Sequence, residues 1–125
     1  MTTDDVNPVE ARASIEVADL DDALAFWTDI AGFDVEVTMG EPPMFAMIRS
    51  GAAHLALARV DTPAAMQIAP VFVTLSGLDA LVARIAAAGL VLESDPTTRP
   101  WGIRDITVRC PGGGPLLAFG EEVAP

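Results

Sequence analysis

Hydrophobic and polar residues follow one pattern along this chain, and the pattern occurs twice. In the first half, apolar Ile15 and Val17 alternate with polar Ser14 and Glu16. Alternation with a period of two residues is typical of a strand that is buried on one face. The sequence therefore predicts a strand over residues 12–18.

A helix is predicted directly after this strand. Asp19 is a suitable N-cap, and Leu20, Leu24 and Trp27 recur at the spacing of one buried helical face. Gly32 provides the stop. The remainder of the first half predicts three strands separated by turns that contain glycine or proline, at residues 33–39, 44–49 and 53–60.

The second half repeats this order. Residues 70–76 resemble the first strand, and an apolar helical stripe begins at Leu78 and ends at Gly89. Leu78 lies 58 residues after Leu20, and Gly89 lies 57 residues after Gly32. Three strands are again predicted to follow, at residues 90–94, 103–109 and 115–120.

This repeat predicts an α+β fold made of two βαβββ modules, whose sheets can face each other and leave a cleft. The length of 125 residues fits a single domain over 1–125. Module one covers about 11–60 and module two about 70–121. A connector with prolines, 61–69, joins them.

Charge and composition exclude several classes of protein. The chain has 18 acidic residues, seven Arg and no Lys, with a net charge of −11. It therefore lacks the basic face that a nucleic-acid partner needs, and it would attract cationic small molecules, although solubility alone also explains such a charge. The single Cys110 excludes a disulfide framework. No apolar run approaches the ~20 residues of a membrane span, and the first residues do not resemble a signal peptide, so we expect a cytoplasmic protein with no membrane partner.

Several short motifs occur in order along the chain and resemble the vicinal oxygen chelate superfamily. This group includes glyoxalases, ring-cleaving dioxygenases, and fosfomycin- and bleomycin-resistance proteins. The resemblance covers roughly residues 11–121. It implies paired βαβββ modules that curl into an open, cleft-bearing, barrel-like sheet, in proteins that are commonly dimeric. The motifs are Val17-Ala18-Asp19-Leu20, Phe26-Trp27, Ala31-Gly32-Phe33, Pro100-Trp101-Gly102-Ile103-Arg104-Asp105 and Cys110-Pro111-Gly112-Gly113.

The resemblance also implies where a metal site would be. Metal-dependent members hold one divalent ion with four His, Glu or Gln side chains, two from each module. The matching positions here are Arg12, Ala56, Pro70 and Ala118. None of these residues is a metal ligand in its ordinary form. We therefore expect no metal and no other cofactor.

His54 is the sole histidine, and it lies two residues before Ala56, on the same strand face. It has three possible roles: a polar contact inside the cleft, a residue on the rim, or a catalytic base with a suitable intrinsic pKa. No nucleophile is arranged with it in the sequence, so we expect no catalytic residue. Cys110 borders a Pro-Gly turn, where we expect a small filler rather than a nucleophile.

Alternation also predicts which side chains line the cleft. The predicted ligand-binding set is polar and aromatic, as a medium-sized organic ligand requires. Glu16 leads it, because an inward charge needs a partner such as Arg49 or Arg104, or else water and ligand in the cleft. Either Phe45 and Met47 or their neighbours Met44 and Ala46 add an apolar wall, and Trp101 is placed to cover the opening. The full set is Glu16, His54, Phe72, Trp101, Arg12, Ser14, Phe45, Thr74 and Asp105.

Three functions remain open from the sequence. The first is a metal-independent homodimer that binds a small organic molecule, with a cationic one favoured, and sequesters an antibiotic as bleomycin-resistance proteins do. The second is a glyoxalase-like lyase, isomerase or dioxygenase-type enzyme with an unconventional or absent metal site. The third is a structural or regulatory module that contacts a partner protein. We favour the first, because the metal positions lack ligands.

Overall fold

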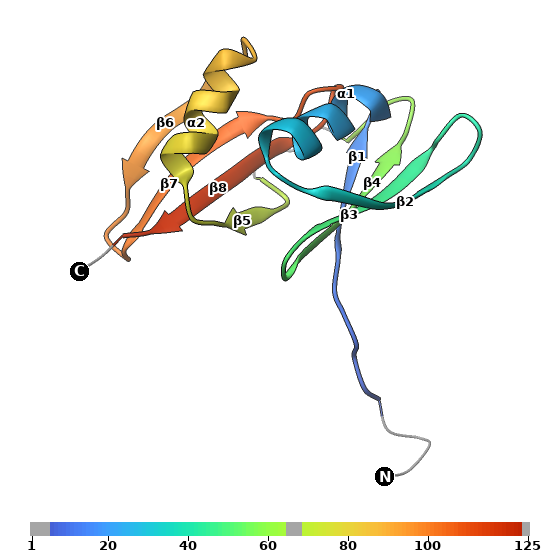
Figure 1. Cartoon of the computed structure of the whole chain (residues 1–125), viewed down its shortest axis with the longest axis horizontal. Helices are drawn as coiled ribbons and strands as arrows, with labels where there is room; N and C mark the ends of the chain where they lie inside the picture. Colours follow the sequence, from blue (N-terminus) through green and yellow to red (C-terminus); the bar gives the residue numbers. More distant parts are fainter. Residues whose placement is uncertain (1–5, 65–68, 124–125) are drawn as a thin grey trace.

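The chain forms two βαβββ modules, as the repeat predicts (Figure 1). The computed structural model describes residues 6–64 and 69–123, so residues 65–68 of the predicted connector lie outside the described residues. Module one contains β1 (Ala13–Val17), α1 (Leu20–Ala25), η1 (Phe26–Ile30), β2 (Asp34–Met39), β3 (Phe45–Ser50) and β4 (Ala53–Arg59). Module two contains β5 (Phe72–Thr74), α2 (Leu78–Ala87), β6 (Leu92–Thr98), β7 (Ile103–Arg109) and β8 (Leu116–Glu122).

Each module forms its own four-stranded sheet, in the orders β1-β4-β3-β2 and β5-β8-β7-β6. In both sheets the first strand pairs in parallel with the last, and the other pairs are antiparallel. The sheets are mixed and open rather than closed. The predicted α+β fold with two repeated modules is therefore confirmed.

The first helix begins where the sequence predicts but does not continue as one α-helix. The Asp19 side chain caps α1 by accepting a hydrogen bond from the Asp22 amide at 3.0 Å. The helix then widens into the π-helical turn η1, in which the Ala31 amide donates to the Phe26 carbonyl at 3.0 Å. Within this turn the Thr28 hydroxyl donates to the Leu24 carbonyl at 2.8 Å, a side-chain bond of the kind that distorts helices.

A cluster of aromatic rings joins the two modules. Trp27 is fully buried, and its ring lies 5.0 Å from that of Phe33 and 5.7 Å from that of Phe119, which belongs to β8. Phe26 lies 6.2 Å from the same Phe119 ring. The turn η1 thus packs against Phe33 of module one and against β8 of module two, at the junction visible in Figure 1.

A backbone contact closes the other end of this junction. The amides of Ala18 and Asp19 donate to the Gly112 carbonyl at 2.8 and 2.9 Å. Gly112 has a φ of +84°, and a Cβ at this position would overlap the Asp19 carbonyl oxygen. Only glycine fits this approach of the β7–β8 turn to the start of α1.

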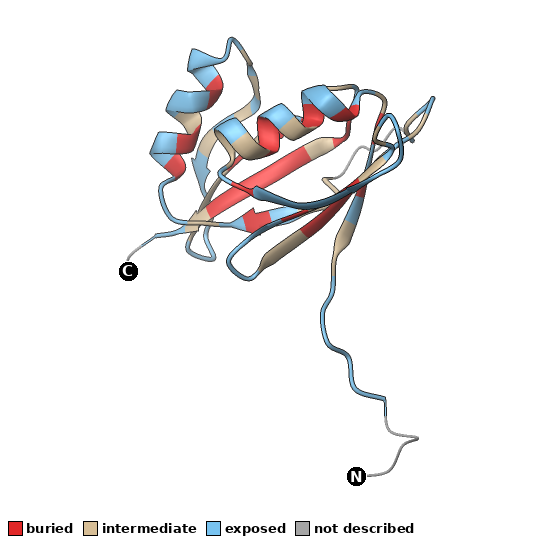
Figure 2. Cartoon of the chain, turned by 45° about the vertical axis from the view of Figure 1, so that its right-hand side comes forward, coloured by how far each residue is buried: buried red, intermediate tan, exposed pale blue. Residues whose placement is uncertain are grey.

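The predicted alternation decides which strand face is buried. Ile15, Val17, Leu55 and Leu57 all point toward the helices and are buried, as expected. On the neighbouring strand β3 it is Ala46 and Ile48 that are buried, so Phe45 and Met47 lie on the opposite face. Of the two alternatives for this strand, Phe45 and Met47 rather than Met44 and Ala46 therefore lie on the face away from the helices. Figure 2 shows the buried residues gathered where sheets and helices meet, with the segment before β1 extending away exposed.

Three strands differ from their predicted bounds by two residues or more at one or both ends. β5 covers Phe72–Thr74 rather than 70–76. β6 runs over Leu92–Thr98 rather than 90–94, and β8 continues to Glu122. Pro96 lies in β6 where the register against β7 shifts, between Ser94 and Thr97. β6 is an edge strand, and an edge strand tolerates a proline because one side of its backbone faces solvent.

Candidate functional site

The predicted site residues of module one share the sheet face that points away from the helices. Ser14 pairs with Ala56 on β4, and Glu16 pairs with Ala58. Phe45, from β3, lies opposite the same Ala58. Ser14 and Glu16 are exposed, so this face is open in the single chain.

Four charged or titratable residues gather at one end of this face, and we call them the Arg12 cluster: Arg12, Glu10, Glu36 and His54. The Arg12 guanidinium forms ion pairs with both carboxylates, from Nε to Glu10 at 2.6 Å and from Nη2 to Glu36 at 2.8 Å. The hydrogen bond to Glu36 makes the largest contribution to raising the pKa of Arg12. Arg12 Nη1 also donates to the carbonyl oxygens of Ile48 and Leu55, each at 3.4 Å. The guanidinium is therefore fixed in place and charged at all working pH values.

His54 completes the cluster without a close hydrogen bond. Its Nδ1 lies 4.0 Å from a carboxylate oxygen of Glu10 and 4.0 Å from one of Glu36. This nitrogen is buried and has no hydrogen-bond partner among the described residues. Since buried polar atoms are normally paired, the imidazole is the least satisfied group of the cluster.

The two glutamates of the cluster are absent from the sequence prediction. Glu10 alternates with Arg12, so their shared face was a usable signal. Glu36 gave no such signal, because it is the extra residue of a bulge: Val35 pairs with Ile48, and Val37 pairs with Met47. A bulge re-aims a side chain in a way that strict alternation does not predict.

The partner of Glu16 also differs from the expected ones. Its Oε1 accepts a hydrogen bond from the Ala64 amide at 3.1 Å, so the carboxylate holds the start of the connector. Arg104, one of the two predicted partners, pairs instead with Asp79 at 2.8 Å. Among the described residues, Arg49 does not form an ion pair with Glu16 either. Of the two alternatives for Glu16, the pairing with an arginine is therefore not formed among the described residues, and contact with water and ligand stays a prediction.

The module-two residues surround Gly120 on the corresponding face of the second sheet. Phe72 pairs with Ala118, and its ring lies over Gly120: a Cβ at Gly120 would be 2.5 Å from Phe72 Cζ. Thr74 and Asp105 pair with Gly120 from either side. The Phe72 side chain is 49% exposed, which leaves an aromatic surface open on this face.

Asp105 and Trp101 are less available than the prediction requires. Asp105 accepts from Arg99, with Nη2 at 3.1 Å and Nε at 3.2 Å. Trp101 lies on the turn between β6 and β7 and is 71% exposed. Its role as a cover for the opening stays a prediction.

The structure brings the predicted site residues together in two groups. Arg12, Ser14, Glu16, Phe45 and His54 lie on the first sheet, and Phe72, Thr74 and Asp105 lie on the second. The two sheets are not hydrogen-bonded to each other as one sheet. Among residues 6–64 and 69–123, the two groups therefore lie on two different sheets.

The positions where the resemblance implies metal ligands do not suit a metal. Ser14 with Ala56 and Phe72 with Ala118 are the matching strand pairs of the two modules, so the two alanines occupy equivalent places. Neither alanine has a donor atom, and the Arg12 guanidinium is already paired with two carboxylates. Among residues 6–64 and 69–123, no group of three or more His, Cys, Asp or Glu is placed to hold a metal ion. These residues do not fit the usual four-ligand centre.

The one cysteine is buried at the module junction rather than at the site. Cys110 is 1% exposed, and burial raises the pKa of its thiol to about 12. A thiol that stays protonated is a poor nucleophile. This environment agrees with the predicted role as a filler.

Solved structures with the same fold are numerous. TioX from Micromonospora sp. ML1 is 22% identical, with a TM-score of 0.73, and covers 93% of this chain and 100% of its own. A lactoylglutathione lyase from Agrobacterium tumefaciens is 21% identical, with a TM-score of 0.71 over 92% of this chain and 95% of its own. The fosfomycin resistance protein FosX from Listeria monocytogenes is 14% identical, with a TM-score of 0.73 over 94% and 96%. At such identities the likeness shows the fold alone.

The family itself is shown by sequence. No curated protein matches the chain. The helices in the described part of the chain are all too short or too polar to span a lipid bilayer. A family model, however, matches residues 10–115, which include module one, the Arg12 cluster and module two as far as the turn before β8. The chain belongs to the Glyoxalase/Bleomycin resistance protein/Dioxygenase superfamily.

Proposed function

We propose that this protein binds a small organic molecule without a metal ion, as a cytoplasmic homodimer, and sequesters the molecule rather than transforming it. The observation that carries the proposal is the Arg12 cluster. An arginine that is paired with Glu10 at 2.6 Å and Glu36 at 2.8 Å stands at a position where metal-dependent relatives have a ligand. The site therefore offers fixed charges and hydrogen-bonding groups rather than an open coordination sphere.

The chemistry of the two faces favours a ligand with both polar and apolar parts. His54 Nδ1 is buried without a partner among the described residues and is available for a hydrogen bond. Phe72 is 49% exposed and presents a flat aromatic surface. With a net charge of −11, the protein would concentrate cationic molecules near these faces.

A second copy of the chain is the natural cover for these faces. Large apolar side chains on the faces remain partly exposed, including Phe72 at 49%, Met39 at 48% and Val37 at 39%. Apolar surface of this kind is costly to leave in water, and burying it stabilises a complex by about 25 cal/mol per Å². A dimer that joined the module-one face of one chain to the module-two face of its partner would place the Arg12 cluster opposite Phe72.

A titration of protein concentration tests the dimer. Sedimentation equilibrium of the wild type is expected to give twice the chain mass, and Phe72→Asp should shift the protein to the monomer, because a carboxylate would enter an apolar contact. Val91→Asp is the matched control, since Val91 is 83% exposed and lies outside both faces. A wild type that stays monomeric at high micromolar concentration would contradict the dimer.

A thermal-shift screen of metal-stripped protein tests the binding function. The ligands are divalent ions, bleomycin-type and other cationic antibiotics, and a set of small metabolites. An organic ligand at 100 times its Kd stabilises the fold by about 2.7 kcal/mol, which is readily seen as a higher Tm. We expect a shift with an organic compound and none with Ni, Zn, Mn or Fe. A shift with a metal alone would contradict metal independence.

The second candidate function is a glyoxalase-like lyase, isomerase or dioxygenase-type enzyme, and one observation favours it. His54 Nδ1 lies 4.0 Å from carboxylate oxygens of Glu10 and Glu36, and a histidine beside a carboxylate is a common general base. If a compound found in the screen is consumed and His54→Gln abolishes turnover while binding remains, the enzyme replaces the sequestering binder. If the compound is recovered unchanged, the binder stands.

A further inference from the structure

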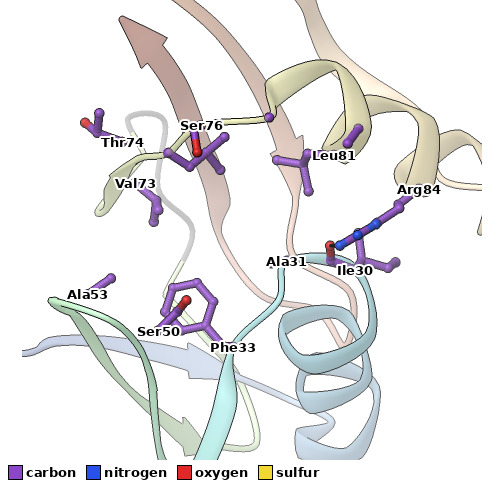
Figure 3. A pocket seen from close by; sticks show the side chains of 13 residues that line it. Ile30, Ala31, Phe33, Ser50, Ala53, Val73, Thr74, Ser76, Leu81 and Arg84 are labelled. Atoms are coloured by element: carbon purple, nitrogen blue, oxygen red, sulfur yellow. Dashed lines mark hydrogen bonds between the residues drawn. The ribbon is translucent and has the colours of Figure 1, made fainter.

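A cavity lies between the two modules, on the helix side of the sheets, and shares only Thr74 with the predicted ligand-binding residues. Its volume is about 370 Å³, which is within the range of small-ligand pockets. Figure 3 shows Val73, Leu81 and Phe33 pointing toward its centre from three different elements of the chain. Val73 precedes Thr74 and follows Phe72 on β5, and its side chain points to the opposite face from that of Phe72.

Both modules contribute to the walls, which combine apolar and polar surface. The end of η1 contributes Ile30 and Ala31, and the β3–β4 hairpin contributes Ser50 and Ala53. The hydroxyl groups of Ser50 and Ser76 add hydrogen-bonding atoms to the lining, and Figure 3 shows both side chains at the cavity. The cavity therefore suits a compact apolar group with a polar end.

The charge of the lining is opposite to that of the protein as a whole. The chain carries 18 carboxylate side chains and a net charge of −11, yet the cavity lining contains no Asp or Glu and one Arg. This residue is Arg84, whose Nη1 donates to the Ile30 carbonyl at 3.3 Å. A guanidinium has five N–H donors, so most remain free for a ligand.

The repeat gives this arginine a special position. The helices α1 and α2 begin at Leu20 and Leu78, and the same offset matches Phe26 with Arg84. Phe26 reaches from module one to Phe119 of module two, with ring centroids 6.2 Å apart. Arg84 reaches back from module two to Ile30 of module one. The contact from module one to module two is thus made by the buried ring of Phe26. The contact in the other direction is made by the cation of Arg84, which lies beside the cavity.

We propose that this cavity is a second binding site, for a small organic monocarboxylate with a compact aromatic or branched aliphatic body. The carboxylate would pair with the Arg84 guanidinium at the rim, because charge-assisted hydrogen bonds of this type are the strong ones. The apolar body would fill the space between Phe33, Val73 and Leu81. The site is independent of the proposed function, since it uses neither the Arg12 cluster nor Phe72.

Three matched probes test the class of ligand. Phenylacetate, phenethylamine and 2-phenylethanol share one apolar body and differ in charge. Each is titrated into the whole protein labelled with ¹⁵N, and binding is followed by amide chemical shifts. We expect phenylacetate to bind at least about tenfold more tightly than the amine. The shifts should cluster at Ala31, Ala53 and residues 73–84.

Two pairs of variants test the place of binding. Ala80→Leu fills the mouth of the cavity from an exposed position on α2, and Ala83→Leu adds the same group on the same helix outside the lining. Arg84→Gln removes the charge, and Arg109→Gln removes one from the exposed end of β7. Ala80→Leu should abolish phenylacetate binding and Arg84→Gln should weaken it about tenfold, while both controls bind like the wild type.

Several results would overturn the proposal. They are no binding of phenylacetate at millimolar concentration, equal binding of the amine, and shifts centred on Ser14 or Phe72. Retained binding in Ala80→Leu would do the same. Amide spectra recorded without ligand test whether each variant is folded. Ala80 and Arg84 are both exposed, so neither substitution changes the hydrophobic core.

Discussion

The two modules share one pattern of strand pairing but differ in what their open faces carry. Ser14 pairs with Ala56 in the first module, and Phe72 pairs with Ala118 at the matching place in the second. Two residues earlier on the last strand, His54 of module one matches Leu116 of module two. The first face carries the charged Arg12 cluster, whereas the second carries the exposed Phe72 ring beside Thr74 and Asp105. The repeat thus preserves the backbone while the exposed side chains diverge, and a ligand that met both faces would contact different chemistry on each side.

The helices differ in the same way. Trp27 of η1 is 0% exposed and contacts rings from both modules, Phe33 and Phe119. Its match in the repeat is Ile85 of α2, which is also buried but is smaller and lies at the outer helix (Figure 1). The first helix therefore buries a large ring between the modules, whereas α2 contacts module one through the hydrogen bond from Arg84 to the Ile30 carbonyl.

The largest expected effect tests this difference between the helices. Trp27→Ala should reduce the free energy of unfolding by about 3–5 kcal/mol, because it removes the contact between modules and leaves a large cavity. Ile85→Ala should cost less, about 2–3 kcal/mol, since it empties a smaller site within one module. Urea denaturation monitored by circular dichroism measures both. Equal losses would show that the first helix is no more central than the second.

The dependence of stability on alkaline pH tests the burial of Cys110, the module-two residue at the junction. Burial raises the pKa of Cys110 from 9.0 to about 12. Above pH 9 the unfolded chain loses this proton and the folded chain keeps it, so stability falls as pH rises from about 9 to 12. The slope approaches about 1.4 kcal/mol per pH unit, and the total loss is at most about 4 kcal/mol.

The composition makes this profile unusually clean to interpret. The chain has no Tyr and no Lys, so Cys110 is the only side chain expected to titrate in this range. Denaturation midpoints measured from pH 8 to 11.5 give the slope, and Cys110→Ala should remove it. A slope that persisted in Cys110→Ala would place its origin elsewhere.

A substitution at Gly120 tests whether the exposed Phe72 ring of the second face needs a glycine beneath it. In module one the matching residue is Ala58, but a Cβ at Gly120 would lie 2.5 Å from Phe72 Cζ and 2.9 Å from Ile103 Cγ2. Gly120→Ala should therefore destabilise the fold by about 1–3 kcal/mol. Adding Phe72→Ala should recover part of this loss in a double-mutant cycle. Strict additivity of the two changes would mean that the ring does not rest on the glycine.

The smallest effect concerns the carboxylate that holds the connector. Glu16→Ala removes the acceptor of the Ala64 amide and should cost about 0.5–1 kcal/mol, because the freed amide can bond to water. The matched control is Thr74→Ala, at the corresponding position of module two, with an expected change below about 0.5 kcal/mol. Chemical denaturation compares the two, and the outcome that contradicts the assignment is an equal loss in both.

The fold was largely predictable because the signals are local. Alternation placed Ile15 and Val17 on the buried face and Ser14 and Glu16 on the other. Successive side chains of a strand point to opposite faces, so one correct residue fixes the others. The π-helical turn was not predictable, since it depends on the Thr28 hydroxyl and on packing against Phe119 of the other module. The boundaries of β6 were missed for a similar reason: its register shifts against β7.

For the site, the sequence predicted the sheet face on which each residue lies, but not its ion-pair partners. His54 and Arg12 were assigned to one face of one sheet, and the structure brings both to the same two carboxylates. The partners themselves come from the segment before β1 and from a bulge in β2. Partner choice of this kind depends on three-dimensional register, which neither spacing nor composition determines.

The placement of the two tryptophans gives the molecule a built-in pair of optical reporters. Trp27 is 0% exposed and Trp101 is 71% exposed, and the chain has no tyrosine to add emission. A soluble quencher would therefore extinguish light from the β6–β7 turn and spare light from the module junction. In the unmodified protein, one emission spectrum would thus separate events at the rim of the second sheet from loosening of the contact between modules.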